Sequence, residues 1–140
     1  MAPSRNPEDL APLLRDFWFK LKARYEDKFP ARRLFLTTTY RSPEEQLAIF
    51  RQNGVDGHIL TKCDGFKIKS KHNYKPSHAF DFAVSLIGGL EGPKTVWDEK
   101  YYKDAADLIK ELGMEKQIRS GGWFTFRDWP HMEIFWPAKP

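Results

Sequence analysis

The chain has 140 residues, of which 41% are hydrophobic and 15% aromatic, and this is enough apolar surface for one packed domain. The composition excludes an intrinsically disordered chain, and no apolar run approaches the roughly 20 residues that a membrane-spanning helix needs. The formal net charge of +4 is compatible with an anionic partner, but a soluble domain with a mild positive surplus explains it as well.

The first predicted element is a helix over about 7–28, preceded by a leader at 1–6 that is expected to be mobile. Asn6 suits the N-cap and Pro7 suits the first helical position. One apolar face is predicted from residues at helical spacing, namely Leu10, Leu13, Leu14, Phe17 and Leu21. The leader lacks the apolar segment of a signal peptide, so we expect the protein to stay in the cytoplasm after synthesis.

β-branched and aromatic residues over 34–40 predict a strand that ends at Arg41. Side chains at a strand-to-helix corner often point into a site, so Arg41 is a candidate site residue, with a surface arginine as the alternative. Ser42 and Glu45 form a capping box for a helix over about 43–52. This helix is expected to turn Leu47 and Phe50 inward and to stop at Gly54.

Residues 53–78 show no clear period and predict a long loop, which in a compact domain is usually functional or disordered. A short hairpin between 59–61 and 66–68 would fit within it. The loop contains the single cysteine of the chain, Cys63, so no disulfide within the chain is possible. Its lysines form either a solvated face or an attractive surface for an acidic polymer, and they are Lys62, Lys67, Lys69, Lys71 and Lys75.

A buried strand is predicted over 79–86, with Asp81 on the face opposite Phe80, Phe82 and Val84. A turn region, a helix and a last strand follow over 88–93, 98–112 and 131–135, and the last strand carries His131, Glu133 and Phe135 on one face. These elements predict a single α+β domain over 1–140, with a small antiparallel sheet and helices packed around it.

Candidate zinc ligands are spread along the chain at His72, Asp81 and His131. A buried carboxylate such as Asp81 costs free energy unless it is paired or bound to a metal. Catalytic zinc sites use three histidine and carboxylate ligands and keep a fourth position for water. Such a site also needs a base near the water, and Asp128 and Glu133 are both candidates.

Two other side chains bear on this chemistry. Arg41 would stabilise the oxyanion that develops on an attacked carbonyl. Cys63 is a possible zinc ligand, but a lone cysteine is more often a small buried apolar residue, and the two histidines and the carboxylate already make a set. The ligand types favour zinc over neighbouring divalent ions.

Four short motifs, taken in order, resemble the zinc peptidases that include D-Ala-D-Ala carboxypeptidases and phage L-alanyl-D-glutamate endolysins. They are Tyr40-Arg41-Ser42 with Gln46, Ser70-x-His72 with Ala79-x-Asp81, Gly121-Gly122-Trp123, and Asp128-x-Pro130-His131. The resemblance covers about residues 34–135. It implies an α+β fold of the hedgehog and D-Ala-D-Ala peptidase type.

The resemblance also implies roles for individual residues. His72, Asp81 and His131 would hold one zinc ion per chain. Asp128 would be the general base, and Arg41 would steady the substrate carbonyl and its oxyanion. Three residues would support the site, namely Ser70, Gln46 and Glu133, the last of which would orient His131.

The spacing between the first histidine and the aspartate departs from the commonest family pattern, which has seven residues and a glycine. Here the separation is nine, with 75–77 inserted and no glycine. The residue seven before Asp81 is Tyr74, which is not a zinc ligand. We therefore expect a longer loop in which His72 keeps its role, while His78 is a rival ligand that a continued strand would turn to the opposite face.

By this resemblance, the chain would be a zinc metallopeptidase that cleaves peptidoglycan stem peptides, most simply at the L-alanyl-D-glutamate bond, as a phage-type endolysin does. It would wait in the host cytoplasm until a membrane pore releases it. It would act as a monomer, with peptidoglycan as partner and with neither nucleic acid nor membrane insertion. No separate wall-binding domain is expected, because the chain ends soon after the last strand.

Two other functions fit the sequence. A D-Ala-D-Ala carboxypeptidase or dipeptidase would keep the zinc and change the substrate. A non-enzymatic basic module that binds wall polymer or nucleic acid would use the lysine-rich loop and the five tryptophans. That module would leave Asp81 and Asp128 without a role.

Overall fold

The computed structural model describes residues 2–55 and 60–135. In them, an antiparallel sheet has the strand order β1-β2-β5-β4, with β3 paired to β2. The strands are β1 (Arg32–Thr38), β2 (Ala79–Leu86), β3 (Lys94–Val96), β4 (Ile118–Ser120) and β5 (His131–Ile134). The helices are α1 (Pro12–Lys28), α2 (Pro43–Phe50) and α3 (Glu99–Glu111), with 3-10 turns η1 (Pro7–Asp9), η2 (Lys71–Asn73) and η3 (Gly121–Trp123). The predicted α+β class is confirmed.

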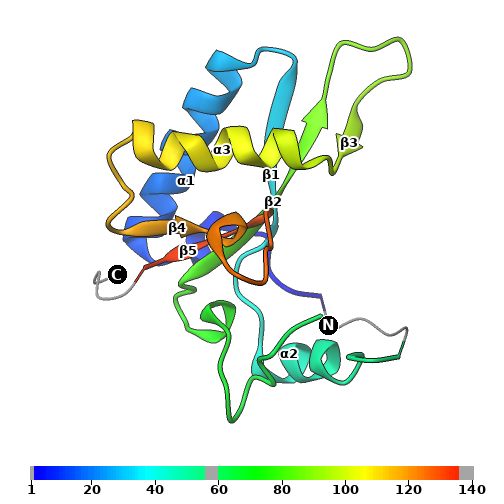
Figure 1. The fold of residues 1–140 in the computed structure, drawn as a ribbon, viewed down its shortest axis with the longest axis vertical. Helices are drawn as coiled ribbons and strands as arrows, with labels where there is room; N and C mark the ends of the chain where they lie inside the picture. The colour runs from blue at the N-terminus through cyan, green and yellow to red at the C-terminus, as the bar shows by residue number, and fades with distance from the viewer. Residues whose placement is uncertain (1, 56–59, 136–140) are drawn as a thin grey trace.

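The hydrophobic core lies between the sheet and the pair α1 and α3, whereas α2 lies at the far end of the molecule (Figure 1). Phe80, Phe82 and Val84 of β2 are fully buried in this core. The contributions of α1 are Leu14, Phe17, Trp18, Leu21 and Tyr25. Because side chains alternate along a strand, Asp81 points away from the core, as predicted.

The strand register extends this polar face across the sheet. β5 pairs with β2 so that His131 lies opposite Asp81, and β4 pairs with β5 so that Arg119 lies opposite Glu133. Met132, between the two polar residues of β5, is buried in the core. The sheet therefore has one apolar face and one face with charged and polar side chains, among them the predicted ligands Asp81 and His131.

The predicted helix over 7–28 is divided in the structure, so that prediction is wrong in its first part. After η1, Leu10 pairs with Ser77, and Ala11 is extended, with ψ 143°, before α1 begins at Pro12. A proline lacks an amide hydrogen and disfavours a helical conformation in the residue before it, so the helix cannot run through Pro12. In the predicted leader, the Ser4 amide donates to the Tyr40 carbonyl and the Ser4 carbonyl accepts from the Thr39 amide, just after β1 ends.

The capping box at the start of α2 is confirmed, but the inward position predicted for Phe50 is wrong. Phe50 is 37% exposed, and the buried residue of α2 is Gln46, because this helix faces a polar site rather than the core. The predicted hairpin does not form within 60–70, and its residue Ile59 lies outside the described residues. The strand and helix predicted at 79–86 and 98–112 are confirmed to within a residue.

Two short strands, β3 and β4, have no counterpart among the predicted elements. Each has three residues, which is too short for a period to show. Among the described residues, no helix combines the length and the apolar character needed to cross a membrane.

Candidate metal centre

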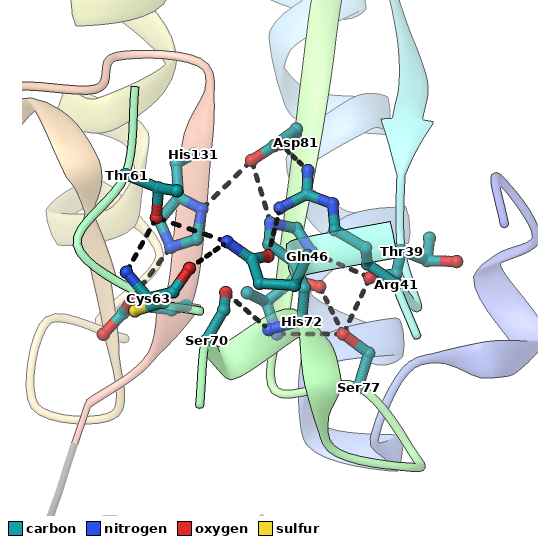
Figure 2. Close-up of polar contacts among 12 residues, drawn as sticks. Thr39, Arg41, Gln46, Thr61, Cys63, Ser70, His72, Ser77, Asp81 and His131 are labelled. Atoms are coloured by element: carbon teal, nitrogen blue, oxygen red, sulfur yellow. Dashed lines mark hydrogen bonds and ion pairs between the residues drawn. The ribbon is translucent and has the colours of Figure 1, made fainter. Parts of the chain in front are cut away.

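The three predicted ligands meet on the polar side of the sheet (Figure 2). Asp81 Oδ1 lies 3.2 Å from His72 Nε2 and 3.0 Å from His131 Nδ1. One ligand atom from each residue lies within 4.8 Å of the other two. Ligand atoms around a tetrahedral zinc ion lie about 3.4 Å apart, since each zinc–ligand distance is about 2.0–2.2 Å. The donor set therefore fits zinc in chemistry and in spacing.

The second nitrogen of each histidine has its own acceptor. His72 Nδ1 lies 2.8 Å from the carbonyl oxygen of Thr39, and His131 Nε2 lies 2.8 Å from Glu133 Oε1. Both acceptors require an N–H donor, so the nitrogens that face Asp81 are the ones left to bind a metal. Acceptors behind the ring are typical of metal-binding histidines.

Electrostatics at the centre favour a cation. Burial raises the pKa of Asp81, but the charge of His72 and the hydrogen bonds from both histidines outweigh it and hold the pKa well below its usual range. Burial lowers the pKa of His131, but hydrogen bonds to Asp81 and Glu133 outweigh it and raise the pKa to about 10. His131 is thus held between two carboxylates, a set that a metal ion would neutralise.

Arg41 lies beside the candidate ligands at the corner predicted for it. Its Nη2 is 3.6 Å from Asp81 Oδ2, and its Nη1 donates to Gln46 Oε1 at 2.8 Å. The buried Gln46 also donates to the Thr61 hydroxyl and the Cys63 carbonyl, at 3.2 and 3.0 Å (Figure 2). Gln46 therefore connects the arginine to the loop across the pocket.

The turn η2 holds His72 in place. Ser70 Oγ accepts from the His72 amide at 3.2 Å, and Asn73 Oδ1 accepts from the Ser70 amide at 2.8 Å. Asn73 Nδ2 also donates to the Arg41 carbonyl at 2.8 Å, which ties η2 to the segment after β1. Ser70 and Asn73 thus both stabilise the turn that carries His72, and sequence reasoning did not single out Asn73.

Glu133 is held between two cationic side chains. Arg119 donates to Glu133 Oε2 from Nε at 2.9 Å and approaches it with Nη2 at 2.8 Å, while Oε1 faces His131. Burial raises the pKa of Glu133, but these partners outweigh it and lower the pKa. Glu133 is therefore a poor proton acceptor. Sequence reasoning missed Arg119, because β4 is too short to be predicted.

Asp128 lies in the turn before β5, and backbone contacts fix that turn. Its amide donates to the Gly121 carbonyl at 2.9 Å, and its carbonyl accepts from the His131 amide at 3.1 Å. Partial desolvation, followed by repulsion from Asp81, raises the pKa of Asp128. A carboxylate with a raised pKa is better suited to accept a proton near neutral pH.

One pocket of about 630 Å³, a size typical of ligand sites, contains the candidate centre. Its lining includes His72, Asp81, His131, Arg41, Gln46, Ser70, Asp128 and Glu133. Its cationic lining residues are Arg41, Lys62, Lys69, Lys71, Arg119 and Arg127. Cys63 also lines the pocket but lies outside the ligand group, and the His78 ring stacks on Tyr74 with centroids 4.6 Å apart. Neither rival ligand joins the group formed by the described residues.

The overall architecture has a solved counterpart. The crystal structure of the Serratia marcescens L-Ala D-Glu endopeptidase ChiX matches with a TM-score of 0.64 and 20% sequence identity, over 93% of this chain and 84% of that chain. The two chains share a fold. Sequence comparison finds no matching family model and no similar curated protein.

Proposed function

We propose that the chain is a zinc metallopeptidase that cleaves peptidoglycan stem peptides at the L-alanyl-D-glutamate bond. The observation that carries the proposal is the meeting of His72, Asp81 and His131 in one pocket, with an acceptor behind each histidine ring. The fold shared with ChiX, an L-Ala D-Glu endopeptidase, supports the choice of substrate.

A zinc ion on the three ligands would supply a water molecule of lowered pKa and polarise the scissile carbonyl. Asp128 accepts the proton of the attacking water and returns it to the leaving amine. Arg41 donates hydrogen bonds to the oxyanion that develops on the carbonyl. Glu133 takes no part in proton transfer. It accepts a hydrogen bond from His131 Nε2 and so leaves Nδ1 to bind the metal.

The charge of the pocket supports an acidic substrate. Six lysine and arginine side chains line it, against the three carboxylates Asp81, Asp128 and Glu133. Stem peptides carry free carboxylates, so this surplus would attract them. The role of a phage-type endolysin, which waits in the host cytoplasm and acts as a monomer after release, belongs to the same proposal and is supported by the motif resemblance.

Digestion of purified peptidoglycan by the zinc-loaded protein, followed by mass spectrometry, tests this function. New amino-terminal D-glutamate is the expected product, and His131→Ala serves as the inactive control. Release of D-alanine would show a carboxypeptidase instead. Binding to the polymer without any cleavage would favour a non-enzymatic module and reject both peptidase functions.

A further inference from the structure

A smaller groove of about 250 Å³ adjoins the metal pocket. It is lined by Glu115, Arg119, Trp123, Phe124 and Phe135, and two of these, Arg119 and Phe124, also line the metal pocket. Trp123 is 40% exposed and Phe135 is 36% exposed. The groove therefore continues the pocket outward and presents aromatic side chains to solvent, a feature that often marks a binding surface.

Cationic side chains lie next to the aromatic rings of the groove. The Arg119 guanidinium lies over the rings of Phe124 and Phe135, 4.8 and 5.1 Å from their centroids. Lys110 Nζ lies 5.4 Å from the Trp123 ring centroid. A pyranose ring packs its C–H face on aromatic side chains and directs its hydroxyl and amide groups toward polar neighbours. The groove therefore suits a sugar better than a fully apolar ligand.

The position of the groove matches the covalent structure of the proposed substrate. In peptidoglycan, the alanine before the L-alanyl-D-glutamate bond is joined through a lactyl group to N-acetylmuramic acid. This connection spans at most about 7 Å when extended, because each residue-length unit adds about 3.5 Å. The Phe124 ring centroid lies 5.9 Å from that of the candidate ligand His131, so the groove begins beside the metal centre at which the scissile bond would lie.

We infer that the groove formed by Glu115, Arg119, Trp123, Phe124 and Phe135 binds the N-acetylmuramic acid ring on the amino side of the scissile bond. The inference rests on the proposed function and deepens it. It makes the protein selective for stem peptides that are still attached to glycan, over free peptides with the same bond.

Two substrates with the same scissile bond test the inference, N-acetylmuramoyl-L-Ala-D-Glu-L-Lys and acetyl-L-Ala-D-Glu-L-Lys. The zinc-loaded protein is expected to cleave the muramoyl substrate with the higher kcat/KM. Trp123→Ala and Phe135→Ala are each expected to reduce this preference about threefold to tenfold, mainly through KM, as loss of one stacking contact implies. Phe19→Ala, which removes a 50% exposed aromatic residue from α1, should keep the preference.

Equal kcat/KM values for the two substrates in the unmodified protein would overturn the inference, as would a full preference in both groove variants. An equal loss on both substrates would make the groove a peptide subsite and would also overturn it.

If neither substrate is cleaved, the proposed function fails on its own. The groove is then tested by titrating the disaccharide of N-acetylglucosamine and N-acetylmuramic acid while following the Trp123 indole signal by NMR. A saturable shift supports the sugar site, and an unchanged signal rejects it.

Discussion

His72 and His131 reach Asp81 through different ring nitrogens, Nε2 in one case and Nδ1 in the other. The difference has a local cause, because the Thr39 carbonyl holds the remaining nitrogen of His72 and Glu133 holds that of His131. These acceptors therefore leave the nitrogens that face Asp81 as the ones available to a metal ion. Partners of this kind typically change metal affinity by about 10- to 100-fold.

Replacing Asp128 by asparagine separates proton transfer from metal binding. Asp128→Asn keeps the size of the side chain and removes the base, so we expect kcat/KM on stem peptides to fall about 10²- to 10⁴-fold. Zinc content should stay at that of the unmodified protein, because Asp128 lies outside the candidate ligand group. Kinetics and metal analysis on the same sample measure both effects. Strong loss of activity in Glu133→Gln, with Asp128→Asn still active, would reassign the base.

Zinc binding is expected to depend on pH through His131. The metal-free protein holds a proton on this residue up to a pKa of about 10, and the ring must lose it to bind zinc through Nδ1. About one proton should therefore be released per zinc at pH 7 to 8, and affinity should rise roughly tenfold per pH unit in this range. Calorimetry in two buffers of different ionisation enthalpy measures the release, and a value near zero would contradict this assignment.

The three candidate ligands could be picked out from the sequence because a histidine or an aspartate in an unusual setting is visible there, as Asp81 is inside an apolar strand. Their supporting partners were less visible. Thr39 acts through its backbone carbonyl, which any residue would provide, and Arg119 reaches Glu133 only through strand pairing. Contacts made by the backbone or by distant pairing leave no local pattern.

At the scale of elements, the turn η3 supports the segment that carries Asp128. A Cβ on Gly121 would lie 2.2 Å from the Asp128 carbonyl oxygen, and one on Gly122 would lie 2.0 Å from the Trp129 ring. Both positions therefore require glycine for close approach rather than for an unusual backbone angle. The glycine pair of the sequence motif thereby sets where the proposed base lies.

Gly121→Ala should displace the Asp128 turn. The clash is with backbone, which cannot rotate away, so we expect a stability loss of about 1–3 kcal/mol and a loss of activity on the order of 10²-fold. Gly89→Ala is the matched control, because its Cβ would meet its nearest neighbour at 4.0 Å. Thermal unfolding and stem-peptide kinetics measure both effects. Full activity in Gly121→Ala would mean that the position of this turn does not matter for catalysis.

The elements with strong periodicity were predicted well, and the errors have physical causes. α3 and β2 carry regular apolar patterns over 13 and 8 residues, and both were predicted to within a residue. α1 begins later than predicted. Pro12 can start a helix but cannot lie inside one, so the helix predicted from Pro7 is interrupted before Pro12. Phe50 of α2 was misplaced because an apolar residue is not always buried, and this helix buries the polar Gln46 instead.

At the scale of the whole molecule, the hydrophobic core and the candidate site lie on opposite faces of one sheet. The face toward α1 and α3 holds the aromatic core, and the opposite face holds the candidate metal centre and its pocket. A metal bound on the second face would join η2, β2 and β5, which are separate in sequence and carry one candidate ligand each. Binding should therefore stabilise the fold as a whole.

Zinc is expected to raise the melting temperature of the metal-free protein. At a free zinc concentration 100 times Kd, the gain in the free energy of unfolding is about 2.7 kcal/mol. His131→Ala should abolish the shift, whereas His78→Ala should retain it, because the His78 ring stacks on Tyr74 outside the ligand group. Calorimetric scans of the three proteins make the comparison. A lost shift in His78→Ala would place that residue among the ligands.

Peptidoglycan cleavage measured during a zinc titration of the metal-free protein tests the metal centre and its proposed function together. Activity should rise linearly with added zinc and level off at one zinc per chain, and His131→Ala should stay inactive throughout. Full cleavage by the metal-free protein would contradict the account, as would a zinc-loaded protein that cleaves nothing.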